Sequence, residues 1–437
     1  MAYSKDVRQA GPGKTVIIGL DGVPHSLLSD LIAKGVLGNL AEIFGQGYFG
    51  KMEVCIPEIS SVSWTSFMTG TQSGEHGIFG FTDLVPNTYQ LRFPNFHDLR
   101  VRTLFDEFGD QGKRSIVINL PSTYPAREIP GILISGFVAI DLNKAIYPKT
   151  LIPKLQEMDY AIDVDVAKAR NDHQFLLADL DRTLNIRKNT TEYLWDHEDW
   201  DLLMVVVTGT DRIHHFLWNA YEKPDHPHHQ DFIRYYQKVD EFMGILYQRY
   251  LDLPGSADGM NHFMMLSDHG FTGVRSEINL NRWLQENDYL SFRNDPPRSL
   301  DDIADETKAF VMDPSRIYIH QKGRYPRGMV EPDDVGRIKE EIRNGLLALE
   351  YEDGKKVIKS VYDRNELYHG PEAEKGPDLV LLSYPGFDLK GKLNSGRVFD
   401  RTVLQGMHTQ NDAFYYSDSS RPVKTIFDIR GQIVMNS

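Results

Sequence analysis

Three apolar runs along the chain are each followed by an acidic residue. The runs cover residues 15–20, 202–207 and 262–266. Short runs of branched and other apolar side chains are typical of strands buried in a parallel sheet. Asp21, Asp211 and Asp268 come after these runs, directly or within a few residues. Because ligands of open α/β sheets collect at the carboxyl edge of the strands, we expect the three acids at one edge.

Helical periodicity alternates with these runs. Apolar side chains recur at helical spacing over residues about 25–46, 101–110, 175–196 and 235–250, and a further strand is expected over 115–118. Strands that alternate with amphipathic helices predict an α/β fold. We expect a mostly parallel central sheet with helices on both faces.

Two segments interrupt this alternation. Residues about 137–175 are irregular, and residues about 285–375 contain several prolines before a charged helix expected over 331–349. We expect one domain spanning residues 1–437, with both segments inserted as a cap over the active-site edge. The core then covers residues about 14–136, 176–284 and 376–437.

Histidines accompany two of the three acids. His269 follows Asp268, and the four-residue step from Asp211 to His215 places both on one face of a helical turn. His214 competes with His215 but lacks that step. A single aspartate after a strand more often caps a turn, but three such strand ends reverse this expectation. Carboxylate and imidazole ligands without thiolate suit zinc, manganese or iron, and two such ions can stabilise a displacement at phosphorus.

A nucleophile is expected between the first and second of these motifs, where residues 57–70 contain several serines. Ser60 lies at the expected start of a helix whose Trp64 and Phe67 face the core. A serine there can be an N-cap, and it can also be a nucleophile, since a helix N-terminus favours a bound phosphoryl group. Both interpretations are compatible, and Ser61 is the nearest alternative nucleophile.

These motifs, together with His76-Gly77-Ile78, resemble the type I phosphodiesterase/nucleotide pyrophosphatase branch of the alkaline phosphatase superfamily. The resemblance runs from about residue 14 to the end, apart from the inserted segments. It implies an alkaline phosphatase-like fold and two divalent metal ions, zinc or alternatively manganese. It assigns one ion to Asp21, Ser60, Asp268 and His269 and the other to Asp211, His215 and His408. On its own, His408 reads as an exposed histidine in a glycine-led loop.

Members of this branch carry a Thr or Ser ten residues before the Gly of a Thr-Gly pair, and here that residue is Ser60, ten residues before Gly70. The resemblance therefore implies a phosphoric ester hydrolase that forms a phosphoserine on Ser60. A phosphodiesterase or nucleotide pyrophosphatase acting on a small anionic phosphoester, such as a nucleotide, is the first expectation. A phosphomonoesterase, a phosphonate hydrolase, a metal-dependent phosphomutase and a non-catalytic ligand-binding descendant are the alternatives. Phe81 stands where the nucleotide pyrophosphatases have an asparagine that holds a phosphoryl oxygen. Arg212, Lys51 and backbone amides near Ser60 are left as candidates for that role.

Composition narrows the class further. The chain has 437 residues, 41% of them hydrophobic and 25% charged, and a net charge of -14, which argues against a general nucleic-acid surface. Cys55 is the only cysteine, so no intramolecular disulfide can form. Residues 1–14 are polar, and no apolar run reaches the roughly 18 residues of a membrane span. We therefore expect a cytoplasmic enzyme without a membrane partner, while the oligomeric state is not constrained. Ile59 stands where the sulfatase signature that begins at Cys55 requires arginine, which argues against a formylglycine sulfatase.

Overall fold

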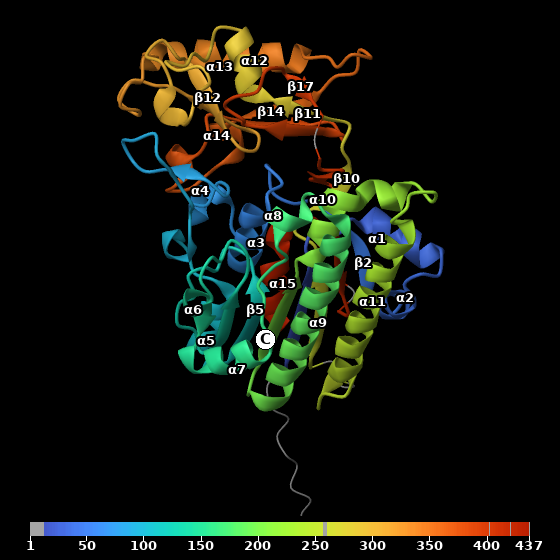
Figure 1. Cartoon of the computed structure of the whole chain (residues 1–437). Helices are drawn as coiled ribbons and strands as arrows, with labels where there is room; N and C mark the ends of the chain where they lie inside the picture. Colours follow the sequence, from blue (N-terminus) through green and yellow to red (C-terminus); the bar gives the residue numbers. More distant parts are fainter. Residues whose placement is uncertain (1–12, 257–259, 402, 420, 437) are drawn as a thin grey trace, which may run out of the picture.

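Eight strands form the central sheet of the computed structural model, which describes residues 13–256, 260–401, 403–419 and 421–436 (Figure 1). Their order is β2-β19-β9-β1-β8-β5-β6-β7. In that order they span Tyr48–Met52, Ala413–Ser417, His262–Leu266, Thr15–Leu20, Leu202–Val207, Ser115–Leu120, Gly131–Ser135 and Ile146–Tyr147. The five central strands run parallel and the outer ones antiparallel. The expected fold class is confirmed, while the polar segment 1–12 lies outside the described residues.

The register of the three expected strands brings their carboxyl ends level. Leu20 of β1 pairs with Val207 of β8, and Gly19 pairs with Leu266 of β9. The residues that follow these strands therefore leave the sheet at the same edge. This edge carries Asp21, Asp211 and Asp268.

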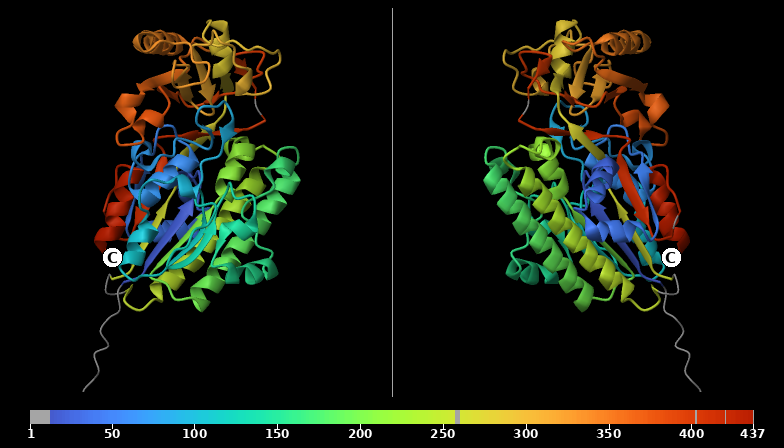
Figure 2. Two further views of the ribbon diagram at one scale, coloured as in Figure 1. Left: turned by 90° about the vertical axis from the view of Figure 1, so that its left-hand side faces the viewer. Right: turned by 90° about the vertical axis from the view of Figure 1, so that its right-hand side faces the viewer.

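Helices cover both faces of the sheet (Figure 2). One face packs against α1 (His25–Ala33), α2 (Gly38–Phe44), α9 (His173–His197), α10 (Gly209–Glu222) and α11 (His229–Leu251). The other face packs against α3 (Ser60–Thr69), α5 (Leu104–Asp110) and α15 (Ile429–Asn436). Successive residues of a strand point to opposite faces, so Val16 and Ile18 enter the first core and Ile17 the second.

Several helices differ from their expected bounds. The helix expected over 25–46 is two helices, because Gly35 adopts a left-handed φ of 71° that ends α1. Helix α5 begins three residues later than expected, because the Thr103 side chain accepts a hydrogen bond from the Asp106 N–H and caps it there. Helix α11 begins at His229, before the expected start at residue 235.

A second body of structure, with its own hydrophobic core, lies above the carboxyl edge (Figure 1). Its strands form two sheets, β12-β13-β15-β14 and β16-β11-β17. In chain order they are β11 (Ser276–Asn279), β12 (Ala309–Met312), β13 (Arg316–Ile319), β14 (Ile358–Asp363), β15 (Leu379–Ser383), β16 (Phe387–Lys390) and β17 (Phe399–Asp400). Its helices are α12 (Leu280–Glu286), α13 (Val335–Ala348) and α14 (Arg364–Leu367). An antiparallel ribbon of β10 (Gly270–Gly273) and β18 (Gly406–Thr409) leads to it from the central sheet.

The two expected cap segments differ in where they pack. Residues about 137–175 supply β7 to the central sheet, and Ile146, Leu155 and Val164 join the core of one sheet face. This segment also holds α6 (Leu142–Ala145), α7 (Ile152–Glu157) and α8 (Val166–Ala169). The upper core instead extends beyond 285–375 to Ile278 and Val398. We propose that the cap comprises residues about 276–400.

Three further short elements lie between α3 and the cap. They are α4 (Ser73–His76), β3 (Asp83–Leu84) and β4 (Leu91–Arg92). Within the described residues, no helix is both long and apolar enough to span a membrane.

Candidate active site

Ser60 and three of the expected ligands meet at the carboxyl edge of the sheet. The His269 Nε2 atom lies 3.4 Å from Asp268 Oδ2, 3.7 Å from Asp21 Oδ1 and 3.1 Å from Ser60 Oγ. Asp21 follows β1, Asp268 and His269 follow β9, and Ser60 begins α3. All four side chains are buried.

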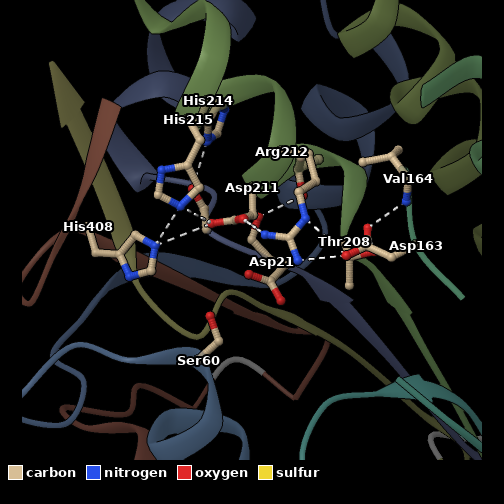
Figure 3. A network of polar contacts seen from close by, with 12 residues as sticks. Asp21, Ser60, Asp163, Val164, Thr208, Asp211, Arg212, His214, His215 and His408 are labelled. Atoms are coloured by element: carbon tan, nitrogen blue, oxygen red, sulfur yellow. Dashed lines mark hydrogen bonds and ion pairs between the residues drawn. The ribbon is translucent and has the colours of Figure 1, made fainter. Parts of the chain in front are cut away.

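Asp211, His215 and His408 form a second group beside the first. Asp211 Oδ1 lies 3.4 Å from Nε2 of His215 and 3.4 Å from Nε2 of His408, and the two Nε2 atoms are 3.1 Å apart. Figure 3 shows this triangle, with the Ser60 hydroxyl directed towards it from the opposite side of Asp21. His269 Nε2 lies 3.9 Å from Asp211 Oδ1, so the two groups are adjacent.

His408 lies in β18, not in the loop that its sequence suggested. Strand β18 pairs with β10, which places His408 opposite Phe271, two residues beyond His269. His408 therefore lies in the ribbon and His269 lies directly before it, so candidate ligands of both groups meet where the ribbon leaves the central sheet.

The geometry of both groups fits divalent cations. In a tetrahedral zinc site with bonds of about 2.0–2.1 Å, neighbouring ligand atoms lie about 3.3 Å apart, close to the edges of the Asp211 triangle. Asp21 Oδ1, Asp211 Oδ1 and Asp268 Oδ2 are buried without a hydrogen-bond partner among the described residues. Each of these oxygens faces an imidazole nitrogen of its group. Because an unpaired buried carboxylate oxygen is costly, a cation at each group would resolve the arrangement.

The second oxygen of each carboxylate is held by the protein. Asp21 Oδ2 accepts from Trp64 Nε1 at 3.1 Å, and Asp268 Oδ1 accepts from the Gly22 N–H at 3.0 Å. Arg212 Nη1 donates to Asp211 Oδ2 at 2.7 Å. These bonds fix which oxygen of each acid faces the imidazoles.

Backbone carbonyls orient the three candidate histidine ligands. The Nδ1 atoms of His215, His269 and His408 lie 3.1, 3.0 and 2.8 Å from the carbonyl oxygens of Gly406, Gly270 and Glu58. A carbonyl can only accept, so Nδ1 carries a proton and Nε2 is the nitrogen that faces the site. A metal ion bound at Nε2 requires a proton on Nδ1 and none on Nε2.

His214 is engaged elsewhere. Its Nδ1 lies 2.9 Å from the Gly22 carbonyl and its Nε2 lies 2.6 Å from the Tyr236 hydroxyl. The ring is fully buried among aromatic side chains. Both nitrogens therefore have structural partners, and His215 is the residue that faces the site.

Crowding of like charges perturbs the first group. Burial and the neighbouring carboxylates of Asp268 and Asp211 raise the pKa of Asp21 well above its usual range. Burial raises the pKa of Asp268 to about 7 and lowers the pKa of His269 well below its usual value. Asp211 differs, because the His215 and His408 side chains and the Arg212 guanidinium lower its pKa although burial opposes this. Asp21 and Asp268 need a compensating positive charge when ionised, and a divalent cation would supply it.

The sequence profile of the type I phosphodiesterase/nucleotide pyrophosphatase family matches residues 15–410. The chain belongs to this family. Its membership makes it a hydrolase, as the motifs predicted. Two sets of side chains are close enough together to hold a metal ion each, Asp21, Asp268 and His269 in one and Asp211, His269 and His408 in the other, and they share His269.

Solved structures of the alkaline phosphatase superfamily share the fold. Phosphonoacetate hydrolase from Sinorhizobium meliloti 1021 in complex with phosphonoformate matches with a TM-score of 0.64 and 16% identity, over 100% of this chain and 99% of that chain. Murine ectonucleotide pyrophosphatase/phosphodiesterase 5 matches with a TM-score of 0.56 and 12% identity, over 97% and 94%. Alkaline phosphatase PafA matches with a TM-score of 0.59 and 13% identity, over 98% and 96%. A search of curated proteins found no match.

The two candidate nucleophiles of this family member face different surroundings. Helix α3 begins at Ser60 with Ile59 as its N-cap, so the Ser60 hydroxyl is not the cap that its position suggested. It contacts His269 instead. The Ser61 hydroxyl is buried and has no hydrogen-bond partner within the described part of the chain, and other atoms of Ser61 line a neighbouring cavity.

The structure also separates the candidates for holding a phosphoryl oxygen. Lys51 is largely exposed and pairs with Asp412 at 3.0 Å. Arg212 is paired with Asp163 at 2.6 Å and with Asp211 at 2.7 Å. At the start of α3, the N–H groups of Val62 and Ser63 donate to the Ile59 carbonyl, whereas those of Ser60 and Ser61 have no acceptor among the described residues and are available to an anion.

Asp163 is a site residue to which the sequence assigned no role. It lies 49 positions before Arg212, in a segment expected to form a cap, and its contact with Arg212 depends on how that segment packs on the sheet. Trp64 is another, because its spacing indicated a core position and not a bond to Asp21. No local pattern indicates either contact.

Proposed function

We propose that this family member is a two-metal phosphodiesterase that acts through a phosphoserine on Ser60. The observation that carries the proposal is the triangle of Asp211, His215 and His408 beside the Ser60–His269 contact. One ion would be held by Asp21, Ser60, Asp268 and His269, and the other by Asp211, His215 and His408. We assign zinc, with manganese as the alternative, from the nitrogen and oxygen ligands.

When bound, the two ions supply positive charge to the phosphoryl oxygens and to the reacting hydroxyl. Ser60 Oγ attacks phosphorus and loses its proton, the bond from phosphorus to the leaving alkoxide breaks, and the alkoxide takes up a proton and departs as an alcohol. Water then cleaves the bond between Ser60 and phosphorus, which releases a phosphomonoester and restores the hydroxyl. Backbone N–H groups at the start of α3 hold a non-bridging oxygen in both steps.

Phosphonate cleavage is the second candidate. The chain matches a phosphonoacetate hydrolase over nearly its whole length, and Phe81 offers no amide to a phosphoryl oxygen. A phosphonate hydrolase would use the same nucleophile and ligands. This alternative would be favoured if the protein released acetate and phosphate from phosphonoacetate and hydrolysed no diester.

The test combines elemental analysis with hydrolysis of bis-p-nitrophenyl phosphate and p-nitrophenyl phosphate. We expect about two ions per chain and faster hydrolysis of the diester than of the monoester. Ser60→Ala should lose turnover, although the variant keeps the carboxylates that are proposed to bind metal. Ser63→Ala is the matched control, since Ser63 is a buried serine of the same helix and its hydroxyl interacts with Cys55. Full turnover in Ser60→Ala would contradict the assignment of the nucleophile. Two ions with neither substrate cleaved would favour a phosphomutase.

A further inference from the structure

A cavity of about 440 Å³ lies between the cap and the segments around α3. Its lining includes Gly70, the C-cap of α3, whereas Ser60 begins that helix. Within the described residues, neither Ser60 nor any candidate metal ligand lines it. Since ligand pockets commonly measure about 300–1,000 Å³, this cavity has room for a small organic molecule. It is therefore a candidate binding site separate from the active site.

The two walls of the cavity are bonded to each other. The Tyr368 hydroxyl of the cap donates to the Ile56 carbonyl at 3.4 Å, and the Gln72 side-chain amide donates to the His369 carbonyl. Gly74 lies so close to the cap that a Cβ atom there would be 2.2 Å from the His369 carbonyl oxygen. In Figure 1, α4 lies directly below the cap. These contacts fix the walls, so the cavity does not depend on a bound ligand.

The lining combines aromatic rings with acidic side chains. Tyr368 and Phe427 contribute the rings, and Glu53 and Glu75 contribute the carboxylates. Neither carboxylate has a hydrogen bond or ion pair with the described part of the chain, and no lysine or arginine is among the described residues of the lining. An aromatic face and an unpaired carboxylate both attract a cation. The lining therefore suits a positively charged ligand with an apolar body.

An organic cation fits this lining better than a metal ion. Among the described residues, the two sets of side chains that are close enough to hold a metal ion both belong to the active site. Glu53 is exposed and Glu75 is half-buried, so both acids are hydrated when the cavity is empty, and charge alone gives little affinity. Contact with the aromatic and apolar surface must supply the rest, which a hydrated metal ion cannot provide.

The cavity also reaches the backbone that supports His408. Val54 of the lining donates its N–H to the Gln410 carbonyl at 3.0 Å and accepts from the Gln410 side chain at 3.2 Å. Gln410 lies two positions after His408. Farther along the segment of Val54, the Glu58 carbonyl oxygen lies 2.8 Å from His408 Nδ1. A ligand in the cavity therefore contacts the segment to which His408 is bonded.

We propose that this cavity binds a small organic cation, an ammonium group on an aryl or alkyl body, which holds the cap against the segment that supports His408. The ammonium group would lie beside Glu53 and Glu75, and the apolar body against Tyr368 and Phe427. Because the cavity does not include Ser60, this ligand is an effector and not a substrate. The binding site does not rest on the proposed phosphodiesterase function, so either can fail without the other.

The first test compares three ligands that share one phenylpropyl body. Titration calorimetry at pH 8 measures the affinity of the protein, supplied with zinc, for 3-phenylpropylammonium, 3-phenylpropanol and 3-phenylpropionate. We expect the cation to bind at least tenfold more tightly than the alcohol, and the carboxylate not to bind. Added salt should weaken binding of the cation but not of the alcohol, because it screens Glu53 and Glu75. Equal affinities for all three ligands, or no binding of the cation, would overturn the proposal.

Substitutions in the lining test the location. Glu53→Gln and Glu75→Gln should each weaken binding of the cation at least threefold and leave that of the alcohol unchanged, because they remove charge and keep the shape of the side chain. Phe427→Leu should weaken binding of the cation more than that of the alcohol, because it removes an aromatic face and stays apolar. Glu241→Gln is the matched control, since Glu241 is an exposed residue of α11 outside the lining. Unchanged affinity for the cation in both lining glutamate variants would refute the location.

Zinc distinguishes the cavity from the carboxylates of the active site, which are the alternative place for an ammonium group. A ligand that supports His408 and a metal ion held there favour each other, so zinc should tighten binding of the cation at least twofold. A cation in the active site would compete with zinc and bind more tightly after its removal, which would reject the cavity. Equal affinity with and without zinc would retain the binding site and reject the effector role. Binding that requires Glu75, in a protein that hydrolyses no phosphodiester, would retain the site and reject the function proposed above.

Discussion

Asp163 and Arg212 form an ion pair at the edge of the metal-ligand group, with Asp163 Oδ2 2.6 Å from Arg212 Nη2. The same guanidinium donates to Asp211 Oδ2 at 2.7 Å (Figure 3). Although burial opposes its charge, the two carboxylates raise the pKa of Arg212, so it stays cationic. Asp163 thus fixes Arg212, and Arg212 fixes the orientation of Asp211.

Asp163→Asn should weaken metal binding, because Arg212 would lose its anchor and Asp211 its fixed orientation. Supporting residues of this kind typically change metal affinity by about 10–100-fold, and we expect a loss in that range. Competition with a chromophoric chelator measures it. Asp181→Asn is the control, since Asp181 forms a surface ion pair with Lys238. Unchanged affinity in Asp163→Asn would show that Asp211 needs no such support.

His215→Ala should lower the metal content, whereas His214→Ala should lower the stability of the fold. Loss of the His215 imidazole removes one corner of the triangle, so we expect the metal content of purified protein to fall while the fold is retained. Loss of His214 leaves the Tyr236 hydroxyl and the Gly22 carbonyl without their partner. That should lower the free energy of unfolding by about 2 kcal/mol and leave the metal content nearly complete. Elemental analysis and denaturant unfolding distinguish the two, and equal metal loss would undo the assignment of His215.

Phe81→Asn should raise activity on methyl p-nitrophenyl phosphate, because it returns the amide that other family members use for a phosphoryl oxygen. Phe81 is only partly buried and packs on Phe137 with ring centroids 5.7 Å apart, so we expect the variant to fold. Phe81→Ala is the control that opens the space without the amide. Equal kcat/KM in both variants would show that the amide contributes nothing, and a loss of folding would make Phe81 a structural residue.

Chelation should lower the melting temperature by several degrees, because unpaired carboxylate oxygens of Asp21, Asp211 and Asp268 would then remain buried. Zinc or manganese should restore it. Differential scanning calorimetry measures the shift. The triple variant Asp211→Asn, His215→Ala, His408→Ala should show a smaller shift, since one ligand group is removed. A melting temperature that is indifferent to chelation would contradict the metal assignment.

The sequence was sufficient to predict the central strands and the edge at which the acids meet. The run 202–207 is unbroken, apolar and ends in three valines, and such a run is typical of a strand buried in a parallel sheet. The step from Asp211 to His215 similarly depends on local helical geometry, and α10 provides it. The prediction of a single helix over 25–46 was wrong, because the left-handed backbone at Gly35 ends the first helix although the apolar spacing continues.

Features that depend on long-range contacts were not predictable. The position of His408 is set by the pairing of β18 with β10, more than 130 residues earlier, and its own neighbours carry no such signal. Segment 137–175 looked irregular because its strand has only two residues, yet it packs on the central sheet. The pairing of Asp163 with Arg212 follows from that packing, so it could not be found before the packing was known.

The ribbon of β10 and β18 is both the connection to the cap and a support of the site. His269 immediately precedes β10, and His408 lies within β18. A rotation of the cap about this ribbon would move both histidines and separate their imidazole nitrogens from the carboxylate oxygens beside them. A cap that stays fixed during turnover would therefore keep the proposed metal ions in place.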